Sequence, residues 1–368
     1  MRAHVCVAGL VALGLSPGCS TSASAPAGGA PKGNTVKSYE QRVEVTGVAL
    51  TPAGSVADAL GGLLAVAPDG RRWALATVEG VRFFDGDKET RAVHVPNGAT
   101  QIRFSADGKT LHVGTHVVDA ATGAVTTAKA PSDLAAWAKQ AGLPAPAQLG
   151  LGAVAASADG TLIVGGASDS AFNRKGPMPP TTGADSDWLI ALDGAWKPLA
   201  AMWHGRGSIS QIAVGERFVA AGGTGPVRIF ARDALTKELG TSPFRGTIGV
   251  AWAPGDALLA AAGGGKQVAV WLAGSWSAPA AGWEVGGAYQ SAVAFHPARP
   301  VLAVANHDGH LRLYGVAAGQ LAKPPLLLDK DVGGDIRGIA WSADGAGLWI
   351  AAGPPAGKLL RFTVAVTP

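Results

Sequence analysis

The sequence IAWSADG (339–345) joins a short apolar stretch to a tight turn, and it decides the fold because the same arrangement recurs along the chain. An apolar stretch of this length can form a buried strand, and the Asp-Gly pair supplies the positive φ that a hairpin turn requires. Six other segments follow this plan: LLAVAPDG (63–70), IRFSADG (102–108), VAASADG (154–160), the weaker IAVGER (212–217), VAWAPGD (250–256) and VAFHPAR (293–299). The chain is therefore predicted to contain seven repeated β units.

Two further strands follow the turn in each unit. The second is apolar, as in TLIVGG (161–166) and VLAVANHDG (301–309). The third alternates as a half-buried strand does, and in five units it ends on an aromatic residue. These third segments are VRFF (81–84), HVVDA (116–120), WLIALDG (188–194), VRIF (227–230), VAVW (268–271), LRLY (311–314) and LLRF (359–362).

The order of the strands resembles a degenerate WD-repeat β-propeller. The copies recur at intervals of roughly 40–55 residues, close to the period of about 40–45 residues in that family. The resemblance covers residues 40–368, although the Gly-His that usually opens a repeat is absent and the closing Trp-Asp survives only as Phe84-Asp85 or as a lone aromatic such as Trp271. It implies an all-β ring of seven four-stranded blades. Because the residues of the family's buried hydrogen-bond relay are missing, we expect apolar packing to hold the blades together.

Closure of the ring requires a strand from the other end of the chain. The last segment, LLRFTVAV (359–366), is the third strand of the seventh blade, so its fourth strand must come from the N-terminal side. The alternation in QRVEVTG (41–47) suits this role. Pairing the two ends removes exposed sheet edges, and we expect neither half of the ring to fold alone.

Composition agrees with an all-β chain and excludes some function classes. Among 368 residues there are 53 Gly and 24 Pro, spread along the chain, which favours many short strands and turns over a helical bundle. The net charge is only +4, and the basic pairs Arg71-Arg72 and Arg174-Lys175 do not form a stripe. A nucleic-acid surface needs several clustered cations, so we expect no nucleic-acid partner.

The first 18 residues are predicted to be a signal peptide. Arg2 precedes an apolar run at 5–15 that is far shorter than the ~20 residues of a membrane-spanning helix. The segment ending Gly18-Cys19-Ser20 resembles the lipobox of bacterial lipoproteins. The only other cysteine, Cys6, lies within the predicted signal peptide, so cleavage before Cys19 leaves that residue without a disulfide partner. Cleavage by the ordinary signal peptidase near residues 23–27 is the alternative.

The lipobox resemblance implies a place in the cell envelope. It implies acyl chains on Cys19 that anchor the chain in a membrane, and Ser20 implies sorting to the outer membrane, facing the periplasm. Residues 19–39 are rich in Ser, Ala, Gly and Pro, so we expect a flexible tether. The propeller would then occupy residues 40–368.

Two segments interrupt the repeat period, and both adjoin the third blade. Residues 130–150, with a short helix expected after Ser132, precede it, and residues 167–187 separate its second and third strands. Such connections leave one face of a propeller, so we expect them side by side with the next loop, MWHGRG (202–207). Because long loops are often functional and Trp and Arg are enriched in binding hot spots, this rim is a candidate site for a protein partner. The candidate residues are Trp137, Phe172, Arg174, Lys175, Met178, Trp203, His204 and Arg206. Alternatively, these are surface insertions whose apolar residues pack back on the blade.

No pattern of catalytic, cofactor-binding or metal-binding residues stands out. The sequence has no G-x-S-x-G elbow and no P-loop. His307 and His310 flank a turn, and LDKDVGGD (328–335) lacks the following Glu of a calcium loop, so we interpret it as an acidic loop. The first strands, which line the channel of a propeller, carry few polar residues: Ser105, Ser157, His296 and Ser342.

Two functions remain open. The first is a membrane-anchored, non-catalytic propeller that binds another protein. The alternative is a propeller enzyme or small-ligand binder, similar to lactonases or quinoproteins, that uses the central channel. A catalytic channel needs convergent carboxylates or histidines, so the apolar first strands favour binding of a protein over catalysis.

Overall fold

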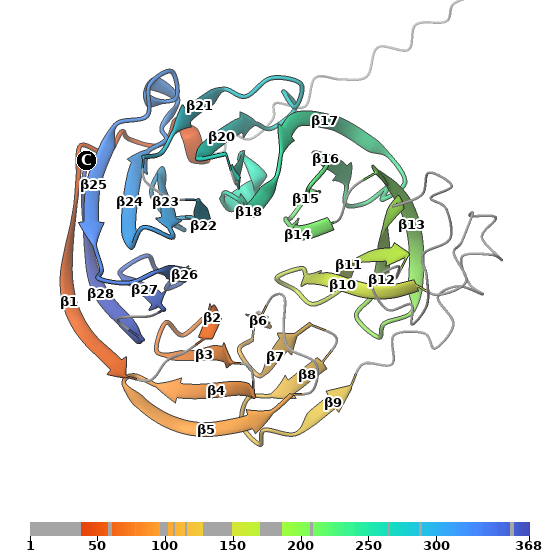
Figure 1. Ribbon diagram of the computed structural model, residues 1–368, viewed down its shortest axis with the longest axis horizontal. Helices are drawn as coiled ribbons and strands as arrows, with labels where there is room; N and C mark the ends of the chain where they lie inside the picture. The colour runs from red at the N-terminus through yellow and green to blue at the C-terminus, as the bar shows by residue number, and fades with distance from the viewer. Residues whose placement is uncertain are drawn as a thin grey trace, which may run out of the picture. The chain divides into compact units, whose positions relative to one another are not determined.

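Seven four-stranded antiparallel sheets are arranged in a ring (Figure 1). The computed structural model describes residues 38–57, 61–77, 79–95, 102–105, 107–114, 116–127, 149–169, 186–206, 209–263, 265–286, 289–353 and 357–368. The predicted signal peptide, Cys19 and most of the predicted tether lie outside these residues. The predicted all-β, seven-bladed propeller is confirmed, and each predicted first and third strand falls in its own blade.

The blades follow the chain in order. Blade 1 contains β2 (Gly61–Val66), β3 (Arg72–Thr77), β4 (Gly80–Asp85) and β5 (Lys88–His94). Blade 2 contains β6 (Ile102–Phe104), β7 (Thr110–Val113), β8 (His116–Asp119) and β9 (Val125–Thr127). Blade 3 contains β10 (Leu149–Ala156), β11 (Leu162–Asp169), β12 (Ser186–Asp193) and β13 (Pro198–Arg206). Blade 4 contains β14 (Ile209–Val214), β15 (Phe218–Gly223), β16 (Pro226–Ala231) and β17 (Glu238–Arg245).

The remaining blades repeat the pattern. Blade 5 contains β18 (Thr247–Trp252), β19 (Leu258–Gly263), β20 (Gln267–Leu272) and β21 (Ala281–Glu284). Blade 6 contains β22 (Gln290–Phe295), β23 (Val301–Asn306), β24 (His310–Gly315) and β25 (Leu326–Asp331). Blade 7 contains β26 (Ile336–Trp341), β27 (Gly347–Ala352), β28 (Lys358–Thr367) and β1 (Gly47–Ala57). Short 3-10 helices occur at η1 (Tyr39–Gln41), η3 (Pro254–Asp256) and η4 (Ala318–Gln320), and no helix among the described residues is long and apolar enough to span a membrane.

The N-terminal strand closes the ring as predicted, but its position along the chain was predicted wrongly. β1 pairs antiparallel with β28 from Gly47 opposite Thr367 to Ala57 opposite Lys358, whereas the prediction placed the strand at residues 41–47. β1 contains Pro52, and a proline in a sequence usually argues against a strand. Here β1 is an edge strand, and Pro52 adjoins a register shift. An edge strand and a register shift both tolerate a residue without a backbone N–H.

The turns after the first strands lie together on one face of the ring, which we call the turn face. In SADG turns the serine hydroxyl donates to the aspartate two residues later: Ser105 to Asp107, Ser157 to Asp159 and Ser342 to Asp344. The same hydroxyls accept N–H groups of the following strand. In blade 6, His296 stands at the serine position, and its Nδ1 accepts the N–H groups of Ala298 and Arg299 within the turn, both at 3.0 Å.

Neighbouring blades are joined at the turn face by polar contacts. The Asp256 carboxylate of blade 5 accepts the backbone N–H groups of Arg217 (2.6 Å) and Phe218 (3.0 Å) of blade 4. Arg232 of blade 4 forms an ion pair with Asp159 of blade 3, at 2.7 Å. These contacts tie blade 4 to both of its neighbours.

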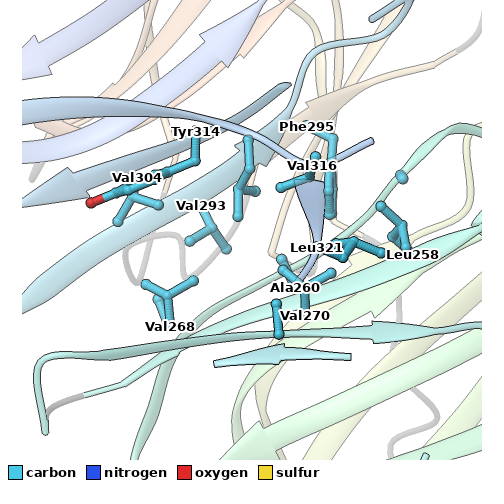
Figure 2. Close-up of a cluster of buried hydrophobic side chains, with 14 of the residues drawn as sticks. Leu258, Ala260, Val268, Val270, Val293, Phe295, Val304, Tyr314, Val316 and Leu321 are labelled. Atoms are coloured by element: carbon cyan, nitrogen blue, oxygen red, sulfur yellow. The ribbon is translucent and has the colours of Figure 1, made fainter. Parts of the chain in front are cut away.

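Apolar packing between blades forms the core. Figure 2 shows one such cluster, in which Leu258, Ala260, Val268 and Val270 of blade 5 face Val293, Phe295 and Val304 of blade 6. The second strands β19 and β23 are buried along their whole length, and their many alanines leave room for the adjacent sheet. Each Val or Leu buried in this way contributes about 1.5–3 kcal/mol.

The aromatic ends of the third strands also pack without the relay of the WD-repeat family. The Trp271 ring lies edge-on to Phe244 at 5.9 Å, and its Nε1 is buried without a hydrogen-bond partner. Trp73 and Phe84 stack at 3.7 Å in blade 1. The prediction that apolar contacts replace the relay is confirmed at Trp271.

The segment before β1 is attached to the turn face. Tyr39, in η1, is 1% exposed and packs edge-on against Phe295, with ring centroids 5.8 Å apart. Its hydroxyl donates to the carbonyl of His296 at 2.7 Å, and Arg42 donates to the carbonyl of Ala298 at 2.8 Å. Burial raises the pKa of the Tyr39 hydroxyl, which therefore remains a donor. The chain thus enters the ring at the blade 6 turn and continues into β1.

Candidate functional site

The predicted rim of blade 3 lies only partly within the described residues. Five of its candidate residues lie outside them: Trp137, Phe172, Arg174, Lys175 and Met178. Trp203, His204 and Arg206 are described at the level of the backbone and belong to strand β13.

The sequence predicted a loop at residues 202–207, and this prediction is wrong for residues 202–206. These residues extend β13, with Trp203 opposite Trp188 and Arg206 opposite Ser186. The register shifts between these two pairs and leaves His204 as the extra residue of a bulge. The sequence GRG looked like a turn, but the long neighbouring strand β12 supplies hydrogen-bond partners as far as Arg206.

The strand ends that flank the two long insertions lie at one edge of blade 3. Leu149, which begins β10, is opposite Asp169, which ends β11. Ser168 is opposite Asp187 at the start of β12. This edge is at the other end of β10 from the turn at 157–160, and therefore on the face of the ring opposite the turn face. The gathering of the eight side chains on this rim stays a prediction.

A central cavity of about 720 Å³ is lined by the first strands of all seven blades. Its wall is largely apolar side chain and backbone, as in Ala155, Val293 and Ile339. The polar residues named from the sequence as channel-lining were wrongly placed: Ser105, Ser157, His296 and Ser342 do not line the cavity but close the turns at the ends of these strands.

Other polar residues line this cavity, and the sequence analysis missed them. Arg103 of β6, His112 of β7 and Gln211 of β14 are the clearest examples. The sequence IRFSADG could have indicated Arg103, because this cation stands between the apolar residues Ile102 and Phe104 of an inner strand. Phe104 is buried. Alternation places Arg103 on the opposite side of the strand, toward the cavity.

Arg103 links two blades and keeps an exposed guanidinium. Its Nη1 donates to the carbonyl of Ala156, the last residue of β10, at 2.9 Å. The side chain touches solvent in the channel, yet protein surrounds it, and this burial lowers the pKa of the guanidinium. The charge of Asp159 raises the pKa of Arg103 and the charge of Arg232 lowers it, so both side chains are close enough to act on the guanidinium.

The carboxylate beside Arg103 is already paired. The Asp159 carboxylate accepts two hydrogen bonds from the Arg232 guanidinium, at 2.7 and 3.0 Å. It also accepts from the hydroxyls of Thr161 (2.8 Å) and Ser157 (2.5 Å). Burial alone raises the pKa of the Asp159 carboxyl, but these hydrogen bonds together hold it well below the usual range. Asp159 therefore remains charged and engaged with Arg232.

His112 faces the same cavity without a partner on one ring nitrogen. Its Nδ1 is buried and accepts or donates no hydrogen bond. Burial, and then the nearby charge of Arg103, lower the pKa of the imidazole. At neutral pH this ring is uncharged.

Histidines and aspartates of blades 6 and 7 lie in contact with one another. His307 contacts Asp335 at 2.5 Å and His310 contacts Asp329 at 2.6 Å. Arg312 lies between Asp329 (3.1 Å) and Asp308 (3.2 Å). The predicted acidic loop partly belongs to strand β25, and the described residues contain no group of three or more side chains placed to hold a metal ion.

Comparison with known proteins supports the fold. No protein-family model matches the chain, and no curated protein matches it in sequence. A chain in a crystal structure of a mitotic checkpoint complex superposes with a TM-score of 0.60 at 17% identity, covering 95% of this chain and 98% of that chain. At this identity the likeness shows the fold alone.

Proposed function

We propose that this protein is a non-catalytic β-propeller, anchored to a membrane in the bacterial envelope, that binds another protein through the rim of blade 3. The observation that carries the proposal is the position of the insertions. Strand ends that flank both long insertions lie at one edge of blade 3, on the face opposite the turn face. Long connections held by a rigid ring are the usual setting of a binding site.

The attachment of the N-terminal segment supports the same arrangement. Tyr39 and Arg42 bind the turn of blade 6, so the chain enters at the turn face. The strand ends that flank the two insertions lie on the opposite face, so the attached segment at Tyr39 and Arg42 does not occupy the face of the proposed rim.

The contacts of two buried or paired carboxylates favour a binding function over catalysis. Asp256 is 2% exposed and holds two backbone N–H groups, and Asp159 is engaged by Arg232. A general base needs a carboxylate or imidazole free to meet a substrate. These two carboxylates serve blade contacts instead.

The proposal is tested by crosslinking in isolated envelopes followed by affinity capture of the protein. The variant replaces residues 170–185 with a short Gly-Ser turn, which leaves the paired ends of β11 and β12 intact. We expect a partner that crosslinks to the wild type and not to this variant.

A second variant, Arg174→Ser with Lys175→Ser, removes two rim cations without shortening the chain. Its matched control, Lys266→Asn with Lys358→Gln, removes two exposed cations from blades 5 and 7. Asn suits position 266, where φ is 64°. Equal capture by the wild type, both rim variants and the control would contradict the proposed site.

A further inference from the structure

We propose that the central channel binds a small oxyanion, a phosphate or carboxylate group, at Arg103 beside His112. The site lies near the turn-face end of the channel, because Arg103 reaches the carbonyl of Ala156, which directly precedes a first-strand turn. This site is separate from the proposed rim of blade 3, and its test does not depend on a protein partner.

The channel has room for such a ligand. Its volume of about 720 Å³ lies within the range of about 300–1,000 Å³ typical of small-molecule sites. The walls are rigid, since they are the inner strands of seven sheets that brace one another. Arg103 donates across one blade boundary, and Trp252 donates to the carbonyl of Ala213 across another at 3.1 Å. A site on strands of this kind is already formed before a ligand arrives.

The charge around Arg103 is incompletely balanced. The guanidinium has five N–H donors, and the hydrogen bond described here uses one of them on a neutral carbonyl. No ion pair among the described residues includes Arg103, and Asp159 is engaged by Arg232. Arg103 therefore keeps charged donors that no carboxylate among the described residues occupies, which favours an anion over a cation as its ligand.

His112 lies beside Arg103, because the two residues are opposite each other in the pairing of β6 with β7. Its Nδ1 is buried and has no hydrogen-bond partner among the described residues, so a ligand in the channel does not reach this atom. Arg103 is therefore the group that would hold the oxyanion, since an Arg guanidinium can bind two oxygens of the same group side by side. The imidazole is close enough for the charge of Arg103 to lower its pKa, so an anion at Arg103 would act on His112 as well.

The electrostatics of the free site agree with this role. Burial lowers the pKa of the Arg103 guanidinium and of the His112 imidazole, and the charge of Arg103 lowers that of His112 further. A bound anion would favour the charged form of both groups and raise both pKa values. A rise in the pKa of His112 would therefore report binding of an anion, separately from the measured dissociation constant.

The test uses the full folded chain with inorganic phosphate, citrate and sodium chloride at equal ionic strength. Binding is measured by calorimetry, and the His112 pKa is measured by NMR of the ring protons. We expect phosphate or citrate to bind and chloride to have no effect. The difference between the phosphate and citrate arms tells which oxyanion the site prefers.

Arg103→Gln should weaken binding by about tenfold or more, since it removes a charged donor pair from the oxyanion. Arg103→Lys keeps the charge and loses the fork, so its affinity should fall between those of the wild type and the glutamine variant. The matched control is Lys109→Gln, which removes an exposed cation with 80% side-chain exposure from the adjacent turn. Circular dichroism and thermal unfolding establish that each variant is folded.

Two results would overturn the proposal. One is a wild-type chain in which phosphate and citrate act no differently from chloride and leave the His112 pKa unchanged. The other is equal affinity in the wild type, Arg103→Gln and Lys109→Gln. If Arg103→Gln fails to fold, the Arg103→Lys variant and the His112 titration in the wild type still decide the question.

Discussion

His296 takes the place that serine occupies in other first-strand turns. It is 4% exposed, and its Nδ1 accepts the N–H groups of Ala298 and Arg299. Burial is the main cause that lowers the pKa of this imidazole, from 6.5 to about 4. Protonation of Nδ1 would remove the acceptor of both hydrogen bonds, so the folded state favours the neutral ring.

The consequence is a loss of stability in mild acid. Because the pKa is lower in the folded state, the unfolded chain binds the proton first, and the contribution of neutral His296 is lost as the pH falls from 6.5 to about 4. We expect the free energy of unfolding to fall by about 2 kcal/mol between pH 7 and pH 5 from this group. In His296→Asn, which keeps an acceptor and cannot titrate, that part of the pH dependence should disappear. Urea unfolding of both proteins at the two pH values measures it, and parallel pH profiles would refute the assignment.

Gln290 is a buried amide without a hydrogen-bond partner among the described residues. It is 0% exposed, and both Oε1 and Nε2 lack a partner. The equivalent first-strand positions of blades 4 and 7 hold Ile209 and Ile336, each followed by the same register shift as Gln290. An apolar residue therefore suits this position.

Gln290→Leu should raise the free energy of unfolding by about 1–2 kcal/mol, since it replaces an unsatisfied amide by an apolar side chain of similar size. Chemical denaturation measures the change. A marked decrease in stability would mean that the amide makes a hydrogen bond after all.

At the level of single residues, the sequence predicted turns better than the channel. The Ser and Asp-Gly of an SADG turn act within a few positions of one another, so a local pattern is enough to find them. The burial of His112 Nδ1 depends on how the folded chain packs around it, and no local sequence pattern contains that information. The position of Arg103 could have been predicted, because a cation between apolar residues of an innermost strand is expected to face the channel.

Among the elements, η1 and β1 hold the ends of the ring together. Tyr39→Phe removes the hydrogen bonds of one hydroxyl to the blade 6 turn and leaves the packing against Phe295. We expect the free energy of unfolding to fall by about 1–2 kcal/mol. The control is Tyr289→Phe, because Tyr289 is 58% exposed, and it should stay within about 0.5 kcal/mol of the wild type. Equal stability of the wild type and Tyr39→Phe in urea would contradict the attachment.

The outer strands were the hardest elements to predict. β1 contains Pro52 and a register shift, and β13 contains a bulge at His204, so neither has the regular alternation of the inner strands. Each is an outer strand of its blade with a single partner, and an edge position relaxes the pattern that burial on both faces imposes. Inner strands such as β23, which is buried throughout, were predicted correctly because a short, continuously apolar stretch is typical of a strand covered on both faces.

For the whole molecule, the proposed lipid anchor makes the clearest prediction. If Cys19 carries the acyl chains, Cys19→Ser should release the protein from membranes into the soluble periplasmic fraction, since the substitution removes the proposed attachment site and leaves the ring untouched. Fractionation of cells followed by immunoblotting measures this. Ser20→Thr serves as a control that keeps the cysteine. Continued membrane association of the Cys19→Ser protein would contradict the anchor.

The pairing of β1 with β28 also sets the order in which the molecule can be completed. Thr46 contacts the carbonyl of Pro368, 322 positions later, so one of the first strands to be synthesised must wait for one of the last. During synthesis, blades formed along the way would stand as an open arc, with β1 unpaired at one end and the seventh blade still missing at the other. Completion of the ring therefore coincides with the synthesis of β28. A chain halted before Lys358 would contain the strands of the first six blades and yet lack the strand that joins β1 to β27.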